Sequence, residues 1–196
     1  MNKLDEINLK YGNAKGKPCH NYFPKYEEKL SQSIEIKTIL EIGVLHGESL
    51  KIWKERWPEA RVFGIDVNDV PELNIEGVKV FKGAQQDKEF VEECLKEIGS
   101  QIDLIIDDGG HLPEQYFASL SFLFPHLTPG ALYFIEDVFT GTCLKGYDFF
   151  PRLIQSTGQY SLMSEDERKS NLDDIELSRG DRDHWLVVLR KRKDAQ

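Results

Sequence analysis

Short apolar runs alternate with helical patterns along the middle of this chain, and this alternation limits the fold more than any other feature. Each run is short enough to be a strand. Its apolar character is typical of a parallel strand that is covered on both faces. The runs lie at residues 38–43, 61–66, 78–82, 102–107 and 131–135. Helical patterns lie at residues 48–57, 87–98 and 113–123. Strands joined by crossover helices predict a mostly parallel sheet with helices on both faces.

The C-terminal part has a different pattern. Residues 175–178 and 184–189 are strand-like and flank Arg-Gly-Asp-Arg-Asp at 179–183, which predicts an antiparallel hairpin. The expected fold class is therefore α/β, a Rossmann-like and mostly parallel sheet that ends in an antiparallel hairpin. A plain nucleotide-binding sheet stays open as an alternative.

Two irregular segments stand outside this alternation. Residues 11–26 are rich in glycine, proline, lysine and aromatic residues, and are expected to form a loop and then a helix over the core. Residues 139–160 follow the fifth strand. Ligands of open α/β sheets bind beyond the carboxyl ends of the strands, so this second segment is expected to cover a substrate.

Size and charge exclude several classes of protein. The 196 residues suit one domain, and a net charge of −9 argues against a charge-driven grip on nucleic acid. No stretch approaches the roughly 20 apolar residues that span a bilayer, and the N-terminus lacks the apolar run of a secretory signal. Cys19, Cys94 and Cys143 are odd in number and scattered, so reduced thiols in a cytoplasm are the simplest interpretation.

A glycine-containing loop follows the first predicted strand and leads into a helix. Gly43 and Gly47 let the backbone turn sharply and approach a ligand, since neither has a Cβ atom. The loop reads Gly-x-x-x-Gly, which departs from the Gly-x-Gly-x-x-Gly that seats a pyrophosphate. S-adenosylmethionine has no phosphate, and Glu41 is a candidate partner for its ammonium group. By itself this loop is weak evidence for a cofactor, and the alternative is a tight strand-to-helix turn without a ligand.

The second and third predicted strands add candidate cofactor contacts. Asp66 ends the second strand about 25 positions after Glu41, as expected for a carboxylate that binds ribose hydroxyls. Gln85, or backbone near it, follows the third strand and is a candidate adenine contact. The alternatives are a solvated strand-end acid at Asp66 and, after the third strand, a loop that ends in the helix cap Asp87.

Four carboxylates and a histidine follow the fourth and fifth predicted strands. Adjacent parallel strands bring their carboxyl ends to one edge of the sheet, so these groups are expected to gather there. Crowded carboxylates are unfavourable unless a cation neutralises them, and all-oxygen ligation suits Mg²⁺, Ca²⁺ or Mn²⁺. Helix caps and solvated acids are the alternative. The residues are Asp107, Asp108, His111, Glu136 and Asp137.

His111 is the best candidate for a general base. A histidine titrates near physiological pH and can accept a hydroxyl proton during methyl transfer. The other histidines are less persuasive, because His46 lies within the glycine loop, His126 near a helix end and His184 at the start of the last strand.

Four stretches of sequence together carry a family pattern. They are residues 11–16 (Tyr-Gly-Asn-Ala-Lys-Gly), the loop 41–49, residues 106–111 (Ile-Asp-Asp-Gly-Gly-His) and residues 133–137 (Tyr-Phe-Ile-Glu-Asp). With these motifs the chain resembles the macrolide and sugar O-methyltransferase group of the class I methyltransferases, including the mycinamicin-type enzymes. Five βα units and a hairpin are also the order of elements in class I methyltransferases.

The resemblance implies a role for each matching residue. It implies Mg²⁺ ligation by Asp108, Glu136 and Asp137, with His111 as general base. Residues 1–36 become an N-terminal cap segment over the cofactor, and residues 37–196 the methyltransferase domain. The positions implied or expected around S-adenosylmethionine are Tyr11, Lys15, Glu41, Gly43, Gly47, Ser49, Asp66, Gln85 and Asp107, the last as a neighbour that supports the site. The family pattern has Thr-Asp where this chain has Asn13-Ala14, and Ser where it has Gly110.

The expected function is S-adenosylmethionine- and Mg²⁺-dependent methylation of a hydroxyl on a sugar or a glycosylated small molecule. The expected partners are that small hydroxyl acceptor and further copies of the chain in a homo-oligomer, with neither nucleic acid nor membrane. Two alternatives are methylation of a catechol or other phenolic hydroxyl, and cofactor binding without catalysis. A nicotinamide dehydrogenase is disfavoured because the phosphate fingerprint is missing.

Overall fold

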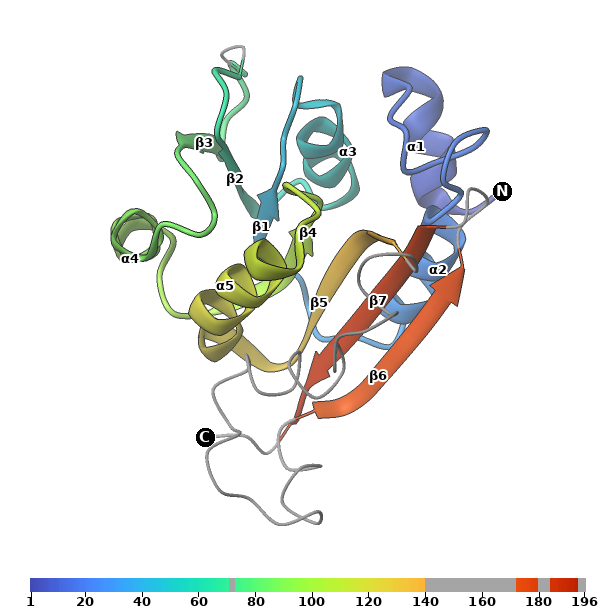
Figure 1. Cartoon of the computed structure of the whole chain (residues 1–196). Coiled ribbons are helices and arrows are strands. Elements are labelled where there is room, and N and C mark those ends of the chain that lie inside the picture. Colours follow the sequence, from blue (N-terminus) through green and yellow to red (C-terminus); the bar gives the residue numbers. More distant parts are fainter. Residues whose placement is uncertain (71–72, 140–171, 180–183, 194–196) are drawn as a thin grey trace.

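The computed structural model describes residues 1–70, 73–139, 172–179 and 184–193, which form a layered α/β fold (Figure 1). The strands are β1 (Thr38–Ile42), β2 (Arg61–Asp66), β3 (Val78–Lys82), β4 (Ile102–Asp107), β5 (Leu127–Phe139), β6 (Leu172–Arg179) and β7 (His184–Lys191). The helices are α1 (Lys3–Tyr11), α2 (Phe23–Leu30), α3 (Glu48–Arg56), α4 (Lys88–Ile98) and α5 (Pro113–Leu123), followed by the 3-10 turn η1 (Phe124–His126).

All described strands belong to one seven-stranded sheet in the order β3-β2-β1-β4-β5-β7-β6. Strands β1 to β5 pair in parallel, whereas β7 pairs antiparallel with both β5 and β6. The predicted mostly parallel sheet with a C-terminal antiparallel hairpin is confirmed. The strand order reverses between β1 and β4, and in open α/β sheets such a switch point is where ligands bind.

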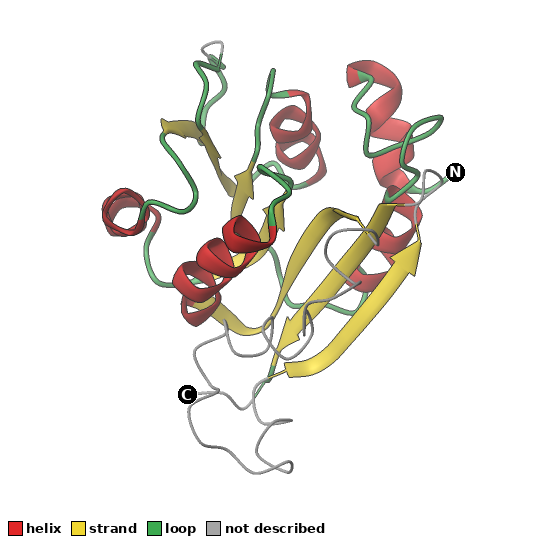
Figure 2. Ribbon diagram, in the orientation of Figure 1, coloured by secondary structure: helices red, strands yellow, loops and turns green. Residues whose placement is uncertain are grey.

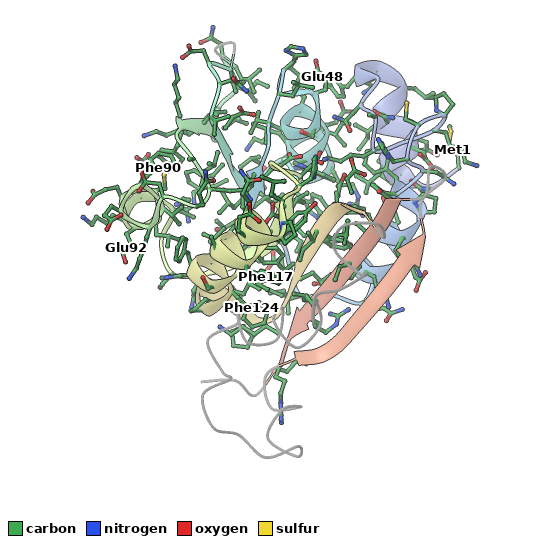
Figure 3. The ribbon with its side chains drawn as sticks, viewed as in Figure 1. Met1, Glu48, Phe90, Glu92, Phe117 and Phe124 are labelled. Carbon is green, nitrogen blue, oxygen red and sulfur yellow. The ribbon has the colours of Figure 1, made fainter. Side chains whose placement is uncertain are left out.

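Two apolar clusters cover the two faces of the sheet, as the helices in Figure 2 do. Successive residues of a strand point to opposite faces, so Leu40 of β1 packs with α4 and α5, whereas Ile39 packs with α1, α2 and α3. Phe117 on α5 packs against the first cluster, to which the buried Phe124 belongs (Figure 3). The layers therefore bury β1 on both faces, as its mostly apolar pattern predicts.

The N-terminal segment is part of the second cluster. Helix α1, which the sequence analysis missed, begins after the cap Asn2 and buries Leu4 and Ile7 against α2 and α3. The predicted loop and helix in residues 11–26 are present as an irregular stretch followed by α2. Whether residues 1–36 cap the cofactor stays a prediction.

Several predictions from the sequence concern residues that lie outside the described ranges. Most of the predicted substrate-covering segment, residues 140–160, lies outside the described residues, as do Cys143 and the hairpin turn at 180–183. In the described part of the chain, no helix has the length and apolar character needed to cross a bilayer.

Candidate active site

A cavity of about 430 Å³ opens at the carboxyl ends of β1, β2 and β4. Its volume falls within the roughly 300–1,000 Å³ of small-molecule sites. Its wall contains Gly43 and Asp66 from the first two strand ends, Gln85 from the third, and Asp108 and His111 from the fourth. The cavity thus joins candidate cofactor residues to the candidate base in a single wall.

Gly43 brings the first and fourth strand ends together. Its φ is +81°, and a Cβ atom built at this position would lie only 1.9 Å from the backbone oxygen of Asp108. Only glycine fits such a close approach in the left-handed region. Gly47, with φ +84°, precedes the first turn of α3 as its cap residue.

Asp66 holds the glycine loop in place. Its Oδ2 accepts hydrogen bonds from the backbone N–H groups of Val44 (2.8 Å) and Leu45 (2.9 Å), and its Oδ1 accepts one from Asn68 N (2.8 Å). Partial burial alone would raise the pKa of Asp66, but the hydrogen bonds from Asn68, Leu45 and Val44 outweigh it and hold the pKa below its usual value. Asp66 is therefore an ionised carboxylate at neutral pH. It binds the glycine loop and also lines the cavity.

Gln85 and Asp107 form a buried support beneath the cavity. The Gln85 amide donates to Asp107 Oδ1 (3.1 Å), and its oxygen accepts from Gly110 N (2.9 Å). Asp107 also accepts from Tyr133 Oη at 3.0 Å and from Ser119 Oγ. Burial raises the pKa of Asp107 to about 6 against these donors. Unlike Gln85, Asp107 is not among the described residues that line the cavity.

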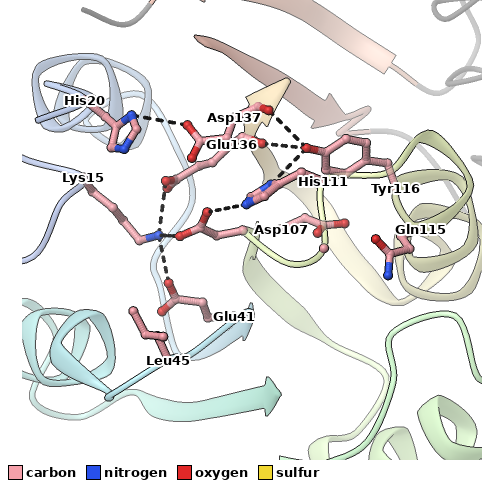
Figure 4. Close-up of polar contacts among 12 residues, drawn as sticks. Lys15, His20, Glu41, Leu45, Asp107, His111, Gln115, Tyr116, Glu136 and Asp137 are labelled. Atoms are coloured by element: carbon pink, nitrogen blue, oxygen red, sulfur yellow. Dashed lines mark hydrogen bonds and ion pairs between the residues drawn. The ribbon is translucent and has the colours of Figure 1, made fainter. Parts of the chain in front are cut away.

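Lys15 provides a cation at the centre of the predicted acidic cluster (Figure 4). Its Nζ lies 3.1 Å from Glu41 Oε1 and 3.2 Å from Glu136 Oε2, and it also pairs with Asp108. Burial would lower the pKa of Lys15, but the charges of Asp108, Glu136 and Glu41 raise it well above its usual value. Part of the charge crowding that predicted a divalent cation is therefore balanced by the chain itself.

Glu41 lies behind the cavity rather than in its wall. Its side chain is fully buried, accepts from Trp53 Nε1 at 2.7 Å and contacts Ser49. Burial raises the pKa of Glu41 against the opposing charge of Lys15.

The Tyr11 hydroxyl, at the end of α1, donates to Glu55 on α3 (2.9 Å).

A β-bulge near the end of β5 sets the direction of the Glu136 and Asp137 side chains. Ile135 pairs with Val187 and Val138 with Trp185, so Glu136 and Asp137 together face the single residue Leu186. Asp137 has φ +53°, a conformation in which aspartate is enriched. In a regular strand, neighbouring side chains point to opposite faces. The bulge lets both carboxylates reach the same site.

Donors from the N-terminal segment hold these two carboxylates. Tyr26 Oη donates to Glu136 Oε1, and Tyr22 Oη donates to Asp137 Oδ1 at 2.7 Å. His20 Nδ1 lies 3.4 Å from the same Asp137 oxygen. Burial raises the pKa of Glu136 to about 8 against the opposing charge of Lys15.

The residues can hold a hard cation. Asp108, His111 and Asp137 each offer one ligand atom, and these atoms lie within 4.8 Å of one another. Two of the three predicted ligands are thus brought together, while both Glu136 oxygens face Lys15 and Tyr26. Carboxylate oxygens suit Mg²⁺. Glu136 as the third ligand stays a prediction.

The predicted site residues fall into two groups. Gly43, Asp66, Gln85, Asp108 and His111 line the cavity. The others belong to the described residues but do not line the cavity, namely Tyr11, Lys15, Glu41, Gly47, Ser49, Asp107, Glu136 and Asp137.

The sequence did not predict Tyr22, Tyr26 and His20 as parts of the site. A signal was available for one pair only, since Tyr22 and Tyr26 are four positions apart, on one face of a helical turn.

Comparison with known proteins shows which proteins this chain is similar to. No family model matches the chain. The L-olivosyl-oleandolide 3-O-methyltransferase of Streptomyces antibioticus is 35% identical over 145 residues, which cover 70% of this chain and 37% of the relative. The mycinamicin VI 2''-O-methyltransferase of Micromonospora griseorubida is 31% identical over 145 residues, covering 70% and 36%. The chain thus spans little more than a third of these relatives.

Solved structures are also similar to this chain over almost its whole length. The MycE methyltransferase of the mycinamycin biosynthetic pathway, in complex with Mg, SAH and mycinamycin VI, matches with a TM-score of 0.77 at 25% identity. The match covers 98% of this chain and 56% of that chain. By sequence and by fold, this chain is a homologue of the macrolide and sugar O-methyltransferases and belongs with them to the class I methyltransferases.

Proposed function

We propose that this chain transfers the methyl group of S-adenosylmethionine to a hydroxyl of a sugar or a glycosylated small molecule, with Mg²⁺ as a second cofactor. The observation that carries the proposal is the shared wall of the cavity. Gly43 and Asp66 belong to the side expected to hold the cofactor, and Asp108 and His111 to the side expected to hold the acceptor. Methyl transfer needs these two reactants side by side.

The residues fit both cofactors. Gly43 leaves open backbone at the cavity wall, and Asp66 is an ionised carboxylate there that can accept ribose hydroxyls. Asp108 and Asp137 would hold the cation, with Glu136 as the third predicted ligand. When bound, the first cofactor supplies an electrophilic methyl group, and the second supplies positive charge that favours an ionised hydroxyl.

His111 is the proposed proton acceptor. It lines the cavity, its side chain is 30% exposed, and its Nε2 lies 3.9 Å from Asp108 Oδ1. A base in this position can reach both the cavity and the predicted cation site. His111 would remove the proton of the acceptor hydroxyl, while the cavity wall fixes the direction of approach.

The relatives support the choice of acceptor. By their names, the relatives methylate L-olivosyl-oleandolide, mycinamicin VI and, in a further case, 8-demethyl-8-alpha-L-rhamnosyl tetracenomycin-C. Because the chain spans little more than a third of the first two, the sugar acceptor, a homo-oligomer and a cytoplasmic location are parts of the proposal.

The test combines methyl transfer with cofactor binding. We expect His111→Ala to abolish transfer from labelled S-adenosylmethionine to a panel of deoxysugar glycosides, while calorimetry still detects cofactor binding. His126→Ala is the matched control, because His126 precedes β5 at the opposite edge of the sheet. Full activity of His111→Ala would overturn the base assignment. Transfer to catechols alone would replace the sugar acceptor, and cofactor binding without transfer in any panel would favour a binding protein.

A further inference from the structure

One tyrosine hydroxyl connects the candidate base to the bulge that carries the acids. Tyr116 on α5 is fully buried, and its Oη lies 3.1 Å from His111 Nδ1. The same Oη lies 3.1 Å from the backbone oxygen of Glu136 and 3.4 Å from that of Asp137 (Figure 4). His111 and Asp137 both have left-handed backbones, with φ +57° and +53°. Two strained positions therefore meet at one polar atom.

The direction of these hydrogen bonds follows from the chemistry of the groups. A tyrosine hydroxyl has one proton to donate, whereas backbone carbonyl oxygens only accept. The two carbonyl oxygens therefore take the proton of Tyr116, which leaves a lone pair of Oη for His111. The reverse arrangement, with the proton directed to His111 Nδ1, would point the hydroxyl lone pairs at two carbonyl acceptors, one of them buried, and remove the donor from both.

Among the residues that the structure describes, no hydrogen-bond partner on the other side of the ring favours the opposite tautomer. Asp108 Oδ1 is 3.9 Å from His111 Nε2, which is too long for a hydrogen bond. This pair therefore has no hydrogen bond that would hold a proton on Nε2. The proton of the neutral imidazole therefore lies on Nδ1, where Tyr116 accepts it.

We propose that Tyr116 is a positioning residue that fixes neutral His111 in the tautomer with Nδ1 protonated and Nε2 unprotonated. The lone pair of Nε2 is then available to accept a hydroxyl proton, and Nδ1–H stays anchored to Tyr116 in both charge states of the ring. Through its carbonyl contacts, the same hydroxyl couples the orientation of His111 to the bulge at Glu136 and Asp137. This inference rests on the proposed function of His111 as the base.

The experiment is nitrogen NMR of the full chain labelled at its five histidines, at a pH where the rings are neutral. Protonated and unprotonated ring nitrogens give separate signals, so the tautomer of His111 is read directly, with His111→Ala used for assignment. We expect the wild type to have Nδ1–H. In Tyr116→Phe this preference should be lost, and kcat should fall by about 10–100-fold, as is usual when a supporting partner is removed.

Tyr133→Phe is the matched control. Tyr133 is also fully buried and loses a comparable hydrogen bond, to Asp107, but does not contact His111 in the described structure. The His111 tautomer should be unchanged in this variant, which separates positioning from a general effect on the core.

Two results would overturn the proposal. One is a wild-type His111 protonated on Nε2, which decides the matter even if Tyr116→Phe does not fold. The other is a Tyr116→Phe variant that folds and retains Nδ1–H. If the tautomer follows Tyr116 but His111→Ala still transfers methyl groups, the proposed function of His111 is wrong and the positioning by Tyr116 stands.

Discussion

Replacing Lys15 by methionine tests how the acidic cluster is balanced. The Lys15 side chain is 3% exposed and pairs with three carboxylates, of which Glu41 and Glu136 are 0% and 2% exposed. Methionine preserves the length and apolar stem but removes the charge. Removing one partner of a buried ion pair costs about 3–5 kcal/mol, out of a typical folding stability of about 5–15 kcal/mol. For a domain of this size, each kcal/mol lowers Tm by about 2–4 °C, so the expected loss is on the order of 6–20 °C.

The assay is thermal unfolding followed by circular dichroism at neutral pH with EDTA. Lys10→Met is the control, because the Lys10 side chain is 61% exposed and its pair with Glu55 is screened by solvent. We expect the control to melt close to the wild type. A Lys15→Met variant that melts with the control would refute the reasoning, since the three acids would then not depend on the lysine.

Magnesium adds a second test with a definite sign. If Lys15 and a divalent cation balance the same carboxylates, Lys15→Met should gain more Tm from added Mg²⁺ than the wild type does. The reverse result, weaker stabilisation by Mg²⁺ in the variant, would mean that Lys15 holds the acids in place for the cation instead of sharing their charge.

Three further predictions concern the cavity and the cation. Gly43→Ala should lose detectable S-adenosylmethionine binding by calorimetry, since its Cβ would meet the Asp108 backbone, whereas Gly99→Ala, after α4 with φ +94° and nothing within 4 Å, should bind normally. Asp66→Asn should weaken cofactor binding by about tenfold or more, because an amide cannot accept on both sides as the carboxylate does; unchanged affinity would exclude the ribose role. Rigorous chelation should abolish methyl transfer and added Mg²⁺ should restore it, and full activity after chelation would remove the metal from the reaction.

The central strands β1, β2 and β4 could be predicted from the sequence because they are buried on both faces. A strand such as β1 is apolar at every position but Thr38 and Glu41, and this pattern survives without any knowledge of its neighbours. Helix α1 was missed because it spans only nine residues and much of it is exposed, so its pattern is weak. Its stability comes from packing on α3 rather than from its own sequence.

The acids could be predicted as a group, but not their partners. Adjacent strand ends must meet, which brings Asp108 near Glu136 and Asp137 whatever the loops do. By contrast, Lys15 reaches Asp108 from 93 positions away, and no local pattern announces such a contact. Tyr116 reads as an apolar position of α5, and only the bulge places carbonyl oxygens against its hydroxyl.

The left-handed backbone of Asp137 changes how substitutions at this position should be interpreted. Aspartate, asparagine and glycine tolerate that conformation, whereas β-branched and bulky residues do not. A chain with valine at this position would lose both the carboxylate and the bend that turns Glu136 toward Lys15. An alanine scan would therefore confuse ligand loss with a change of backbone, and asparagine is the substitution that separates the two. The same restraint means that an aspartate kept here among relatives would report on chain geometry as much as on chemistry.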